Sequence, residues 1–417
     1  MRIVVCGLGH VGVVTAAALL REGHTVIGVD NNAAVCDVLG RGLAPFREPD
    51  IGEIIAVGHA EGRLSIAAGL NDIAEADVAF ICVGTGGLPD GSLDLADLRT
   101  ASQTLGEAIR LRAPDLQPIL LVFRSTMLPG TMTTTLMPAL LAAIGEPPGR
   151  RYHVAYHPEF MREGCALADY FAPARIVIGE QSPGTADKLK ELYAGIDAPI
   201  VATSLETAEL IKFADNSFHA LKVCFANEVG RLAASSGISP SELFQLFCMD
   251  TKLNLSAAYL RPGGAFGGPC LSKDIQALAH HMKVSGISAP VIDHIVASNQ
   301  AHTDFLIAEI KRRAPPPRSR ILLVGLSFKA NTDDIRQSPL ADLAQQLLTD
   351  GYDLAVYDSD LVATGDGKSR LAPWLAKIAV QKIHSDDTWD LAVIGKNQPD
   401  AIKVLNSSIP LFNIDRL

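Results

Sequence analysis

The chain has 417 residues, a formal net charge of −10 at pH 7, 48% hydrophobic residues and 20% charged residues. At about 150 residues per domain, this length predicts two or three domains, and the ordinary balance of apolar and charged residues excludes a mainly disordered chain. The acidity argues against a general nucleic-acid-binding protein, because phosphate contacts need clustered Lys and Arg, but it does not exclude a basic pocket for a small anion.

The first third of the chain alternates short apolar runs with helical periodicity, as in Val13–Arg21 and Leu95–Arg110. The runs rich in Val and Ile are predicted to be buried strands: Ile3–Val5, Thr25–Val29, Val78–Val83 and Ile119–Phe123. Such alternation is typical of βαβ units around a parallel sheet. Three later runs are predicted to extend that sheet: His153–Tyr156, Arg175–Ile178 and Pro199–Ala202. Residues 1–203 are therefore expected to form one α/β domain.

A glycine-rich loop, Gly7-Leu8-Gly9-His10-Val11-Gly12, joins the first predicted strand to the first helix. In a GxGxxG loop the first Gly allows a tight turn, the second lets a pyrophosphate approach the backbone, and the third lets helix and strand pack closely. The helix N-terminus offers amide groups and a partial positive charge to the phosphates. Asp30 ends the second strand, where a carboxylate binds ribose hydroxyls and repels a 2′-phosphate. This arrangement predicts a site for NAD rather than NADP, the alternative being a tight turn without a ligand.

The segment Pro158–Gly164 contains Glu159 and Glu163, four residues apart. Two carboxylates at this spacing could share one helical face. On spacing alone, however, a solvated charged turn is the favoured interpretation of this segment.

Residues Leu205 to about Ser235 are predicted to form one long helix, because apolar residues recur at steps of three and four. Lys212, Asn216 and His219 share a face of it, and an ammonium beside an amide could stabilise an oxyanion. A polar stripe facing solvent is an equal alternative. A long helix with apolar residues around much of its circumference is also a candidate for pairing two subunits.

A second glycine-rich segment, Arg261–Pro269, precedes Cys270 at the predicted start of another helix. Its glycines expose the backbone to a ligand, and Arg261 can pair with phosphate oxygens. The helix dipole and Lys273 favour the thiolate of Cys270, which is the predicted nucleophile. The other six cysteines are interpreted as small core side chains or residues of unmarked loops. No pair has CxxC spacing, so no metal site is predicted, and reduced thiols in the cytoplasm are expected.

Three prolines, Pro315, Pro316 and Pro317, predict a stiff boundary after a helical region at 204–313. Beyond them apolar runs again alternate with helices and are predicted to be strands: Ile321–Val324, Leu354–Tyr357, Leu391–Ile394 and Leu411–Phe412. Residues 318–417 are thus expected to form a second α/β domain. The loop Gly325–Arg336 lacks the second and third glycines of a dinucleotide loop, so Lys329 and Arg336 are candidates for binding another phosphate-bearing ligand.

Together these motifs resemble, in the right order and over nearly the whole chain, the UDP-glucose/GDP-mannose dehydrogenase family. KLNLSAAYLRPGGAFGGPCLSKD at 252–274 and FHALKVCFANEVG at 218–230 are similar to the active-site loop and central helix of the members that act on GDP-mannose. The resemblance implies an α/β fold with two Rossmann-like parallel-sheet domains, joined by a central helical domain whose long helix pairs two subunits. It also implies an NAD-dependent four-electron oxidation, with GDP-mannose converted to GDP-mannuronate. UDP-glucose or a UDP-N-acetylhexosamine is the alternative substrate.

The resemblance also implies roles for individual residues. Cys270 would form a thiohemiacetal and then a thioester. Lys212 and Asn216 would hold the oxyanion, Asp274 and Thr126 would position the water or a proton-transfer route, and Glu159 is a candidate base. The expected cofactor site comprises Gly7, Gly9, His10, Val11, Gly12, Asp30, Thr85, Thr126, Lys273 and Arg336. The expected substrate site comprises Glu163, Lys212, Asn216, His219, Asn227, Tyr259, Leu260, Arg261, Pro262, Gly264, Gly267 and Lys329.

Some positions depart from the family pattern. His10 replaces the Tyr of the family pattern, and Val35 replaces a Lys that reaches the cofactor. Gly86 replaces a Pro, His157 replaces an Asn, and Gly264 replaces a Phe. Two other hypotheses are a β-hydroxyacid dehydrogenase, which would need neither Cys270 nor a second α/β domain, and a non-catalytic NAD-binding protein. The expected partners are a nucleotide sugar and a second copy of the chain, with no nucleic acid and, because no long uncharged apolar stretch occurs, no membrane.

Overall fold

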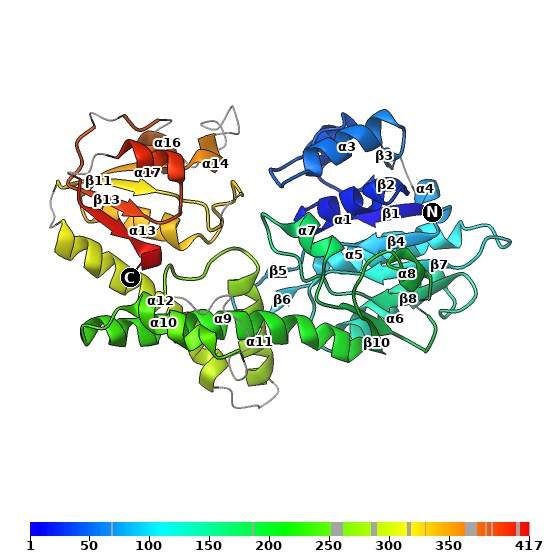
Figure 1. The fold of residues 1–417 in the computed structure, drawn as a ribbon. Coiled ribbons are helices and arrows are strands. Elements are labelled where there is room, and N and C mark those ends of the chain that lie inside the picture. The colour runs from blue at the N-terminus through cyan, green and yellow to red at the C-terminus, as the bar shows by residue number, and fades with distance from the viewer. Residues whose placement is uncertain are drawn as a thin grey trace. The chain divides into compact units, whose positions relative to one another are not determined.

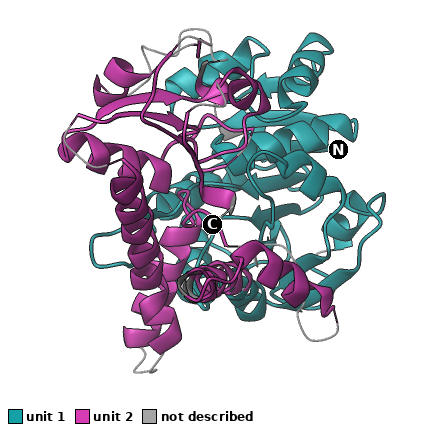
Figure 2. Ribbon diagram, turned by 60° about the vertical axis from the view of Figure 1, so that its left-hand side comes forward, with its two compact units in different colours: residues 1–214 teal, residues 215–417 magenta. Residues whose placement is uncertain are grey.

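The chain divides into two compact units, Met1–Ala214 and Asp215–Leu417 (Figure 2). A computed structural model describes residues 1–67, 70–185, 187–251, 262–284, 290–314, 318–329, 331–362, 373–379, 382–384, 387–405 and 409–416. The division between the units falls inside α9 (Leu205–Ser235), the long helix that the sequence predicts. The three-domain boundaries inferred from the sequence stay predictions, and the prolines at 315–317 lie outside the described residues.

Within the described residues, the first unit contains a sheet of eight strands in the order β10-β9-β8-β7-β4-β1-β2-β3 (Figure 1). The strands are β1 (Arg2–Cys6), β2 (Thr25–Val29), β3 (Leu64–Ile66), β4 (Val78–Ile81), β7 (Ile119–Phe123), β8 (Tyr152–Tyr156), β9 (Ile176–Glu180) and β10 (Ile200–Ser204). Central strands such as β7, buried at all five positions, carry continuous apolar runs because helices cover both faces of the sheet. This confirms the predicted α/β class.

The sheet is not parallel throughout, which corrects the expectation from the sequence. β8 and β9 pair antiparallel, whereas β9 and β10 pair parallel with each other. An apolar run does not encode the direction of its strand, so the sequence could not predict this reversal. The short strand β3 and the small hairpin of β5 (Gly86–Gly87) and β6 (Leu93–Asp94) were also not predicted.

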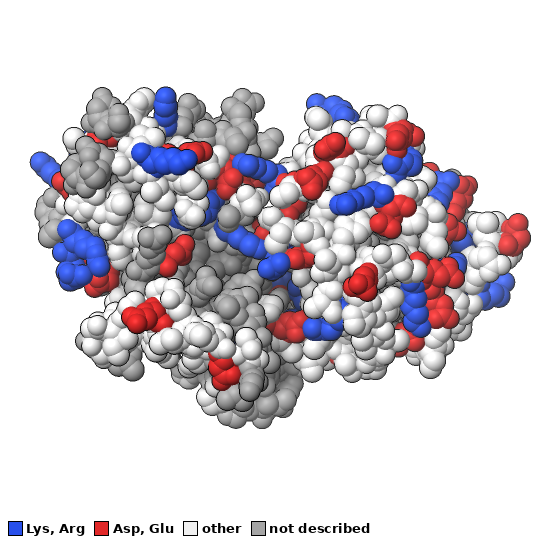
Figure 3. Space-filling model, viewed as in Figure 1, with Lys and Arg blue, Asp and Glu red and all other residues white. Residues whose placement is uncertain are grey.

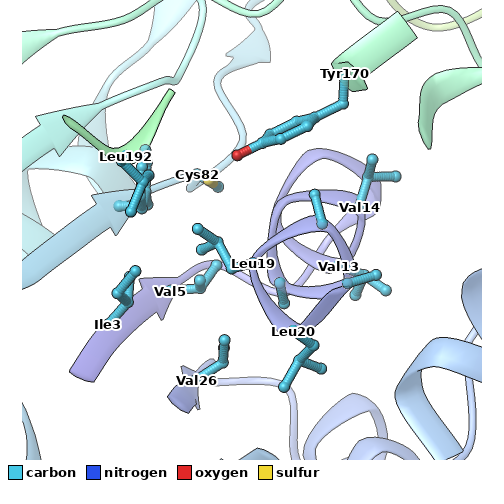
Figure 4. Packing of buried hydrophobic residues seen from close by; sticks show 14 of the residues in the cluster. Ile3, Val5, Val13, Val14, Leu19, Leu20, Val26, Cys82, Tyr170 and Leu192 are labelled. Atoms are coloured by element: carbon cyan, nitrogen blue, oxygen red, sulfur yellow. The ribbon is translucent and has the colours of Figure 1, made fainter. Parts of the chain in front are cut away.

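Helices cover both faces of this sheet. They are α1 (His10–Arg21), α2 (Ala33–Gly40), α3 (Ile51–Ala60), α4 (Leu70–Ala74), α5 (Ala96–Arg110), the π-helical turn η1 (Met132–Leu136), α6 (Met137–Ile144), α7 (Ala166–Phe171) and α8 (Asp187–Leu192). One apolar core joins the sheet to α1, α3, α7 and α8, and Figure 4 shows Val13, Leu19 and Leu20 of α1 within it. A second core joins the opposite face to α5, η1, α6 and the first turn of α9.

The second unit combines helices with a smaller sheet. After α9 come α10 (Pro240–Met249), α11 (Leu271–Val284), α12 (Pro290–Arg313), α13 (Pro339–Thr349), α14 (Ser359–Val362), α16 (Pro373–Ile378), α17 (Pro399–Val404) and η2 (Ile414–Arg416). Its strands are β11 (Arg320–Val324), β12 (Asp353–Tyr357), β13 (Leu391–Ile394) and β14 (Leu411–Asn413). Their order is β12-β11-β13-β14 and every pair is parallel, as predicted. Helices α12, α13 and α16 pack on one face of the sheet and α17 on the other.

Figure 3 shows basic and acidic groups interspersed on the visible face of each unit. No helix in the described part of the chain has the length and apolar character needed to cross a membrane. Among the described residues, no group of His, Cys, Asp and Glu is arranged to hold a metal ion.

The packing of α1 leads to a stability prediction. Leu19 is 0% exposed in the core of the first unit, whereas Leu111, beyond the end of α5, is 59% exposed. Replacing Leu19 by Ala should lower the free energy of unfolding by about 2–5 kcal/mol, because a cavity replaces buried methyl groups. Urea unfolding of Leu19→Ala measures this, with Leu111→Ala as the matched control. Equal losses in the two variants would contradict the assignment of α1 to the core.

Candidate active site

The glycine loop of the first unit is built around two close backbone contacts. Gly7 has a φ of 86°, and a Cβ there would lie 2.7 Å from the amide nitrogen of Val83. A Cβ at Gly12 would overlap the carbonyl oxygen of Gly7. A Cβ at Gly9 would meet nothing within 4 Å, so this backbone is open to a ligand. Gly7 thus makes the tight turn, Gly9 leaves the backbone open, and Gly12 allows the close packing of helix and strand, as the motif predicts.

The carboxylate of Asp30 lies at the same edge of the sheet. Its two oxygens accept the amide of Leu8 at 2.5 Å and the amide of Asn32 at 2.7 Å. Both donors are main-chain N–H groups, and neither is charged. They hold the carboxylate next to the glycine loop. This is the position in which an acid can accept hydrogen bonds from ribose hydroxyls.

His10, in the first turn of α1 beside Val11, is directed toward the protein. Its Nε2 lies 3.0 Å from the carboxylate of Glu48, and its ring stacks on Phe46 with 4.9 Å between centroids. Glu48 is buried and also accepts the amides of Gly164 at 2.9 Å and Ala166 at 2.8 Å. Glu48 was not predicted from the sequence, because its partners are 38, 116 and 118 residues away and no motif links them. Glu163 lies partly buried beside this contact.

Thr85 and Thr126 meet beyond the ends of the adjacent strands β4 and β7. The hydroxyl of Thr85 donates to the carbonyl of Thr126 at 2.8 Å. The turn that follows Thr126 is held by Glu209 of α9, which is 0% exposed and accepts the amides of Gly130 at 2.6 Å and Met132 at 2.8 Å. Burial raises the pKa of the Glu209 carboxyl to about 7, although both amide bonds oppose that shift.

Glu159 and Lys212, predicted from separate segments, form a buried ion pair. Lys212 Nζ donates to Glu159 Oε1 at 2.8 Å, and the two side chains are 7% and 9% exposed. The second Glu159 oxygen accepts the amide of Met161 at 2.8 Å. Burial alone would raise the pKa of Glu159, but the charge and hydrogen bond of Lys212 outweigh it and the pKa is lowered. Glu159 is thus held as a carboxylate, and the interpretation of its segment as a solvated turn is wrong.

Two more buried groups neighbour this pair. Arg124, at the end of β7, donates to the hydroxyl of Tyr193 at 3.2 Å, and its charge adds to the lowering of the Glu159 pKa. Burial, reinforced by Arg124, lowers the pKa of His157 to about 3. The neutral ring must therefore donate through Nδ1, because its partner at 2.7 Å is the carbonyl of Val177. His157 is a structural residue rather than a titrating one near neutral pH.

The second unit holds Cys270 immediately before the first turn of α11. Its thiol is exposed, and its carbonyl accepts the first helical hydrogen bond, from the amide of Asp274 at 2.9 Å. The side chain of Asp274 is 1% exposed and accepts a short hydrogen bond from Asn216 Nδ2 of α9. The ammonium of Lys273 lies 3.6 Å from the other oxygen of Asp274. The thiol therefore stands at the positive end of a helix dipole, and the first turn of that helix carries Lys273 and the buried carboxylate of Asp274.

The glycine-rich segment before Cys270 is tied to α9 and α12. Asn227 Oδ1 accepts the amide of Gly263 at 3.1 Å, and His302 Nε2 lies 2.6 Å from the carbonyl of the same glycine. Asn299 bonds both the amide and the carbonyl of Phe266 at 2.9 Å. Asn227 Nδ2 is buried with no hydrogen-bond partner among the described residues, so it can donate to a ligand or to water. Asn299 and His302 were not predicted from the sequence, because they belong to no recognisable motif.

The glycines of this segment serve packing more than exposure. Gly267 packs against Pro339, and Gly268, with a φ of 90°, packs against the ring of Phe328. Pro262 packs against Gly230 of α9 and Gly264 lies near Ile414. Tyr259, Leu260 and Arg261 lie outside the described residues.

The remaining expected ligand contacts lie at separate places in the second unit. Arg336 pairs with Asp334 through Nε at 3.0 Å and Nη2 at 2.6 Å. The carbonyl of Lys329 accepts the hydroxyl of Ser327 at 3.1 Å. His219 is partly buried on α9. These bonds are all within the protein and say nothing about ligand binding, so the binding roles of Arg336, Lys329 and His219 stay predictions.

Comparison with known proteins places this geometry in context. The model of the UDP-glucose/GDP-mannose dehydrogenase family matches in three parts: its NAD binding domain at residues 1–197, its central domain at 206–301 and its UDP binding domain at 322–390.

Individual relatives cover most of the chain. GDP-mannose 6-dehydrogenase of Azotobacter vinelandii is 40% identical over 87% of this chain and 82% of its own. UDP-glucose 6-dehydrogenase of Haloferax volcanii is 32% identical over 89% of this chain and 85% of its own. Among solved structures, a UDP-glucose dehydrogenase from the archaeon Pyrobaculum islandicum superposes with a TM-score of 0.90 at 32% identity, covering 99% of this chain and 94% of that one.

The raised pKa of Glu209 predicts a pH-dependent contribution to stability. The folded pKa is about 7 and the ordinary value is 4.5, so the folded state binds the proton more tightly and stability falls as pH rises between those values. Glu209→Gln removes this titration. The stability of the wild type relative to Glu209→Gln should therefore be larger at about pH 5 than at about pH 8, by on the order of 1–3 kcal/mol.

Urea unfolding at the two pH values measures the difference. Glu191→Gln, on the exposed side of α8, corrects for the general effect of removing a carboxylate. A Glu209→Gln difference that does not change with pH would show that Glu209 titrates in its ordinary range.

Proposed function

Because this chain belongs to the UDP-glucose/GDP-mannose dehydrogenase family, we propose that it oxidises the C6 alcohol of GDP-mannose to the carboxylate of GDP-mannuronate. The chain is an NAD-dependent nucleotide-sugar dehydrogenase by family, and the proposal concerns the sugar nucleotide and the residues that act on it. Its main support in the structure is the exposed thiol of Cys270 at the N-terminus of α11, one helical turn before Asp274, whose buried side chain accepts a hydrogen bond from the partly buried Asn216.

The first unit supplies the cofactor site. The open backbone at Gly9 and the N-terminus of α1 suit a pyrophosphate, and Asp30 suits the ribose hydroxyls. Bound there, NAD would supply the hydride acceptor, one NAD for each of the two oxidation steps. Thr85 and Thr126 line the same strand edge, where the hydrogen bond between them fixes the backbone.

The covalent step belongs to Cys270. After loss of the first hydride, C6 is an aldehyde, and the thiolate adds to it to form a thiohemiacetal. Loss of a second hydride from C6 gives a thioester, and water then displaces the thiolate to release the carboxylate. The covalent bond retains the aldehyde and turns it into a hydride donor again.

The groups proposed to stabilise charge and to transfer protons are Lys212 and Asp274, each of which has a hydrogen-bond partner in the structure. Lys212, held beside Glu159, is the donor for negative charge that develops on the substrate oxygen, with Asn216 four residues further along α9. Asp274, next to Cys270, is the group that positions the attacking water and takes up its proton. We assign Glu159 to orienting Lys212 rather than to general-base catalysis, because its lowered pKa makes it a weak base.

We also propose that two copies of the chain pair through α9. Leu210 and Phe218 are 46% and 42% exposed and lie about two turns apart on one side of the helix; Phe225, 43% exposed, continues that side, and its ring contacts Phe244 and Phe247 of α10. Large apolar side chains gathered along one helix are characteristic of an interface.

Oxidation of UDP-glucose is a second candidate function. The Pyrobaculum islandicum structure with a TM-score of 0.90 is of a UDP-glucose dehydrogenase, and the matched C-terminal family domain is described as UDP binding. The sugar nucleotide would then be UDP-glucose, with the same cysteine chemistry.

Initial rates on a substrate panel separate the two candidates. With GDP-mannose, UDP-glucose and UDP-N-acetylmannosamine compared by NADH formation and by acid product, GDP-mannose should have the highest kcat/KM by at least about tenfold. A higher kcat/KM for UDP-glucose would replace GDP-mannose by that substrate.

The cysteine mechanism predicts the stoichiometry and the effect of one substitution. The wild type should form two NADH per uronic acid with no aldehyde released. Cys270→Ala should slow acid formation by at least about 10³-fold while leaving NAD binding intact, because the thioester cannot form. Cys248→Ala, on α10, is the matched control and should retain activity. One NADH per turnover with release of the aldehyde would refute covalent capture.

A further inference from the structure

The second α/β sheet repeats the backbone turn of the first. Gly7 follows β1 with a φ of 86°, and Gly325 follows β11 with a φ of 94°. Each glycine donates its N–H to the carbonyl at the end of the neighbouring strand, Gly7 to Val29 at 2.8 Å and Gly325 to Tyr357 at 2.7 Å. The two turns therefore have the same local construction, although the loops that follow them share no glycine pattern.

An acid completes the turn in both sheets. Leu8 donates its amide to Asp30 at 2.5 Å, and Leu326 donates its amide to Asp358 at 2.8 Å. Each acid is the first residue after its strand, β2 or β12. In the first sheet this is the acid to which a ribose is assigned, so the second sheet contains an equivalent acid whose role has to be explained.

The two turns differ in the residue that follows the next neighbouring strand, β4 in the first sheet and β13 in the second. Ile81 of β4 pairs with Cys6, and Ile394 of β13 pairs with Val324, so the strands end in the same register. Two residues later, the backbone that packs against the turn glycine belongs to Val83 in the first sheet and to Lys396 in the second. An apolar side chain in one copy is thus replaced by a cation in the other.

Lys396 turns this position into an ionic network. It is 8% exposed, and its ammonium lies 2.8 Å from Asp360 Oδ2 and 3.2 Å from Asp358 Oδ2. The ammonium also donates to the hydroxyl of Ser327, by a short hydrogen bond, and to the carbonyl of Lys329 at 3.4 Å. One buried cation therefore bonds to two acids and to the loop that follows the turn.

Asp358 has no exposed surface left for a ligand. Its side chain is 0% exposed and accepts the amides of Leu326 and Ser327, the hydroxyl of Ser327 and the side-chain amide of Gln398 at 2.8–3.0 Å, besides Lys396. Burial would raise the pKa of Asp358, but the charge of Lys396 and the amide bonds lower it. A carboxylate has about four lone-pair positions, so this one is saturated from within the protein.

We propose that Lys396 is a positioning residue of the nucleotide-sugar site: it satisfies the acid of the second turn in place of a ribose, and thereby fixes the loop that carries Lys329. Because Lys396, at the position equivalent to Val83, occupies Asp358, the second sheet cannot bind the ribose of a dinucleotide through that acid. The loop after β11 is then available to bind a nucleoside diphosphate. The inference rests on the proposed function, since Lys329 is a ligand contact only if the second unit binds the substrate nucleotide.

The test is Lys396→Met in the full-length protein, with GDP binding measured by calorimetry and the kinetics measured with GDP-mannose. Met keeps the length of the side chain and removes its charge. The variant should bind GDP about tenfold more weakly and raise the KM for GDP-mannose by a similar factor, the scale of one lost charge-assisted hydrogen bond. The kcat and the KM for NAD should stay within about twofold, because neither Cys270 nor the first unit is touched.

Lys403→Met, which removes an exposed cation from α17 of the same unit, is the matched control and should behave as the wild type. If Lys396→Met does not fold, Lys396→Met/Asp360→Asn removes a cation and an anion together and is measured in its place. GDP affinity within twofold of the wild type in a folded variant overturns the proposal, as does failure of both variants to fold, which would make the network structural only. Parallel titrations with UDP distinguish failure of the Lys396 proposal from a wrong substrate. If the wild type binds UDP and not GDP, GDP-mannose is not the substrate, and the effect of Lys396→Met is then measured on UDP affinity.

Discussion

A buried ion pair between Lys212 and Glu159 ties the long helix α9 to the loop after β8. Burying either charge alone would be strongly unfavourable, so each residue requires the other, and the Met161 amide satisfies the second carboxylate oxygen. One turn earlier, Glu209 fixes the same helix to the turn after β7. The two contacts define how α9 lies on the first unit, and with it where Lys212 stands.

The same helix continues into the second unit, where Asn216 bonds Asp274 one turn into the helix that Cys270 precedes. Within the second unit, α9 therefore carries the amide that orients Asp274 in the first turn of α11. Catalytic groups held on a helix keep their spacing better than groups on separate loops, because the helix fixes it through its own backbone hydrogen bonds. Asn216 and Asn227, which bond α11 and the glycine-rich segment to α9, are both placed in this way.

The acids at the ends of β2 and β12 illustrate how a repeated turn acquires two uses. The carboxylate of Asp30 accepts two main-chain amides, those of Leu8 and Asn32, whereas Asp358 is enclosed by Lys396, Ser327 and Gln398. The difference depends on which side chain follows the third strand, not on the turn itself. Equivalent backbone geometry thus does not imply equivalent ligand chemistry.

The sequence by itself determined the elements and the chemistry that depends on local order. Strand β2, strand β7 and helix α9 coincide with the predicted ranges, because burial on both sheet faces and an unbroken helical period leave direct marks in composition. The glycine loop and the placement of Cys270 before a helix were predictable for the same reason. Tertiary structure alone decided the reversed direction of β9, the pairing of Lys212 with Glu159, and the contacts of Glu48 and Lys396. These depend on residues far apart in the chain, whose contacts are set by packing and the satisfaction of buried charge, and no local pattern records them.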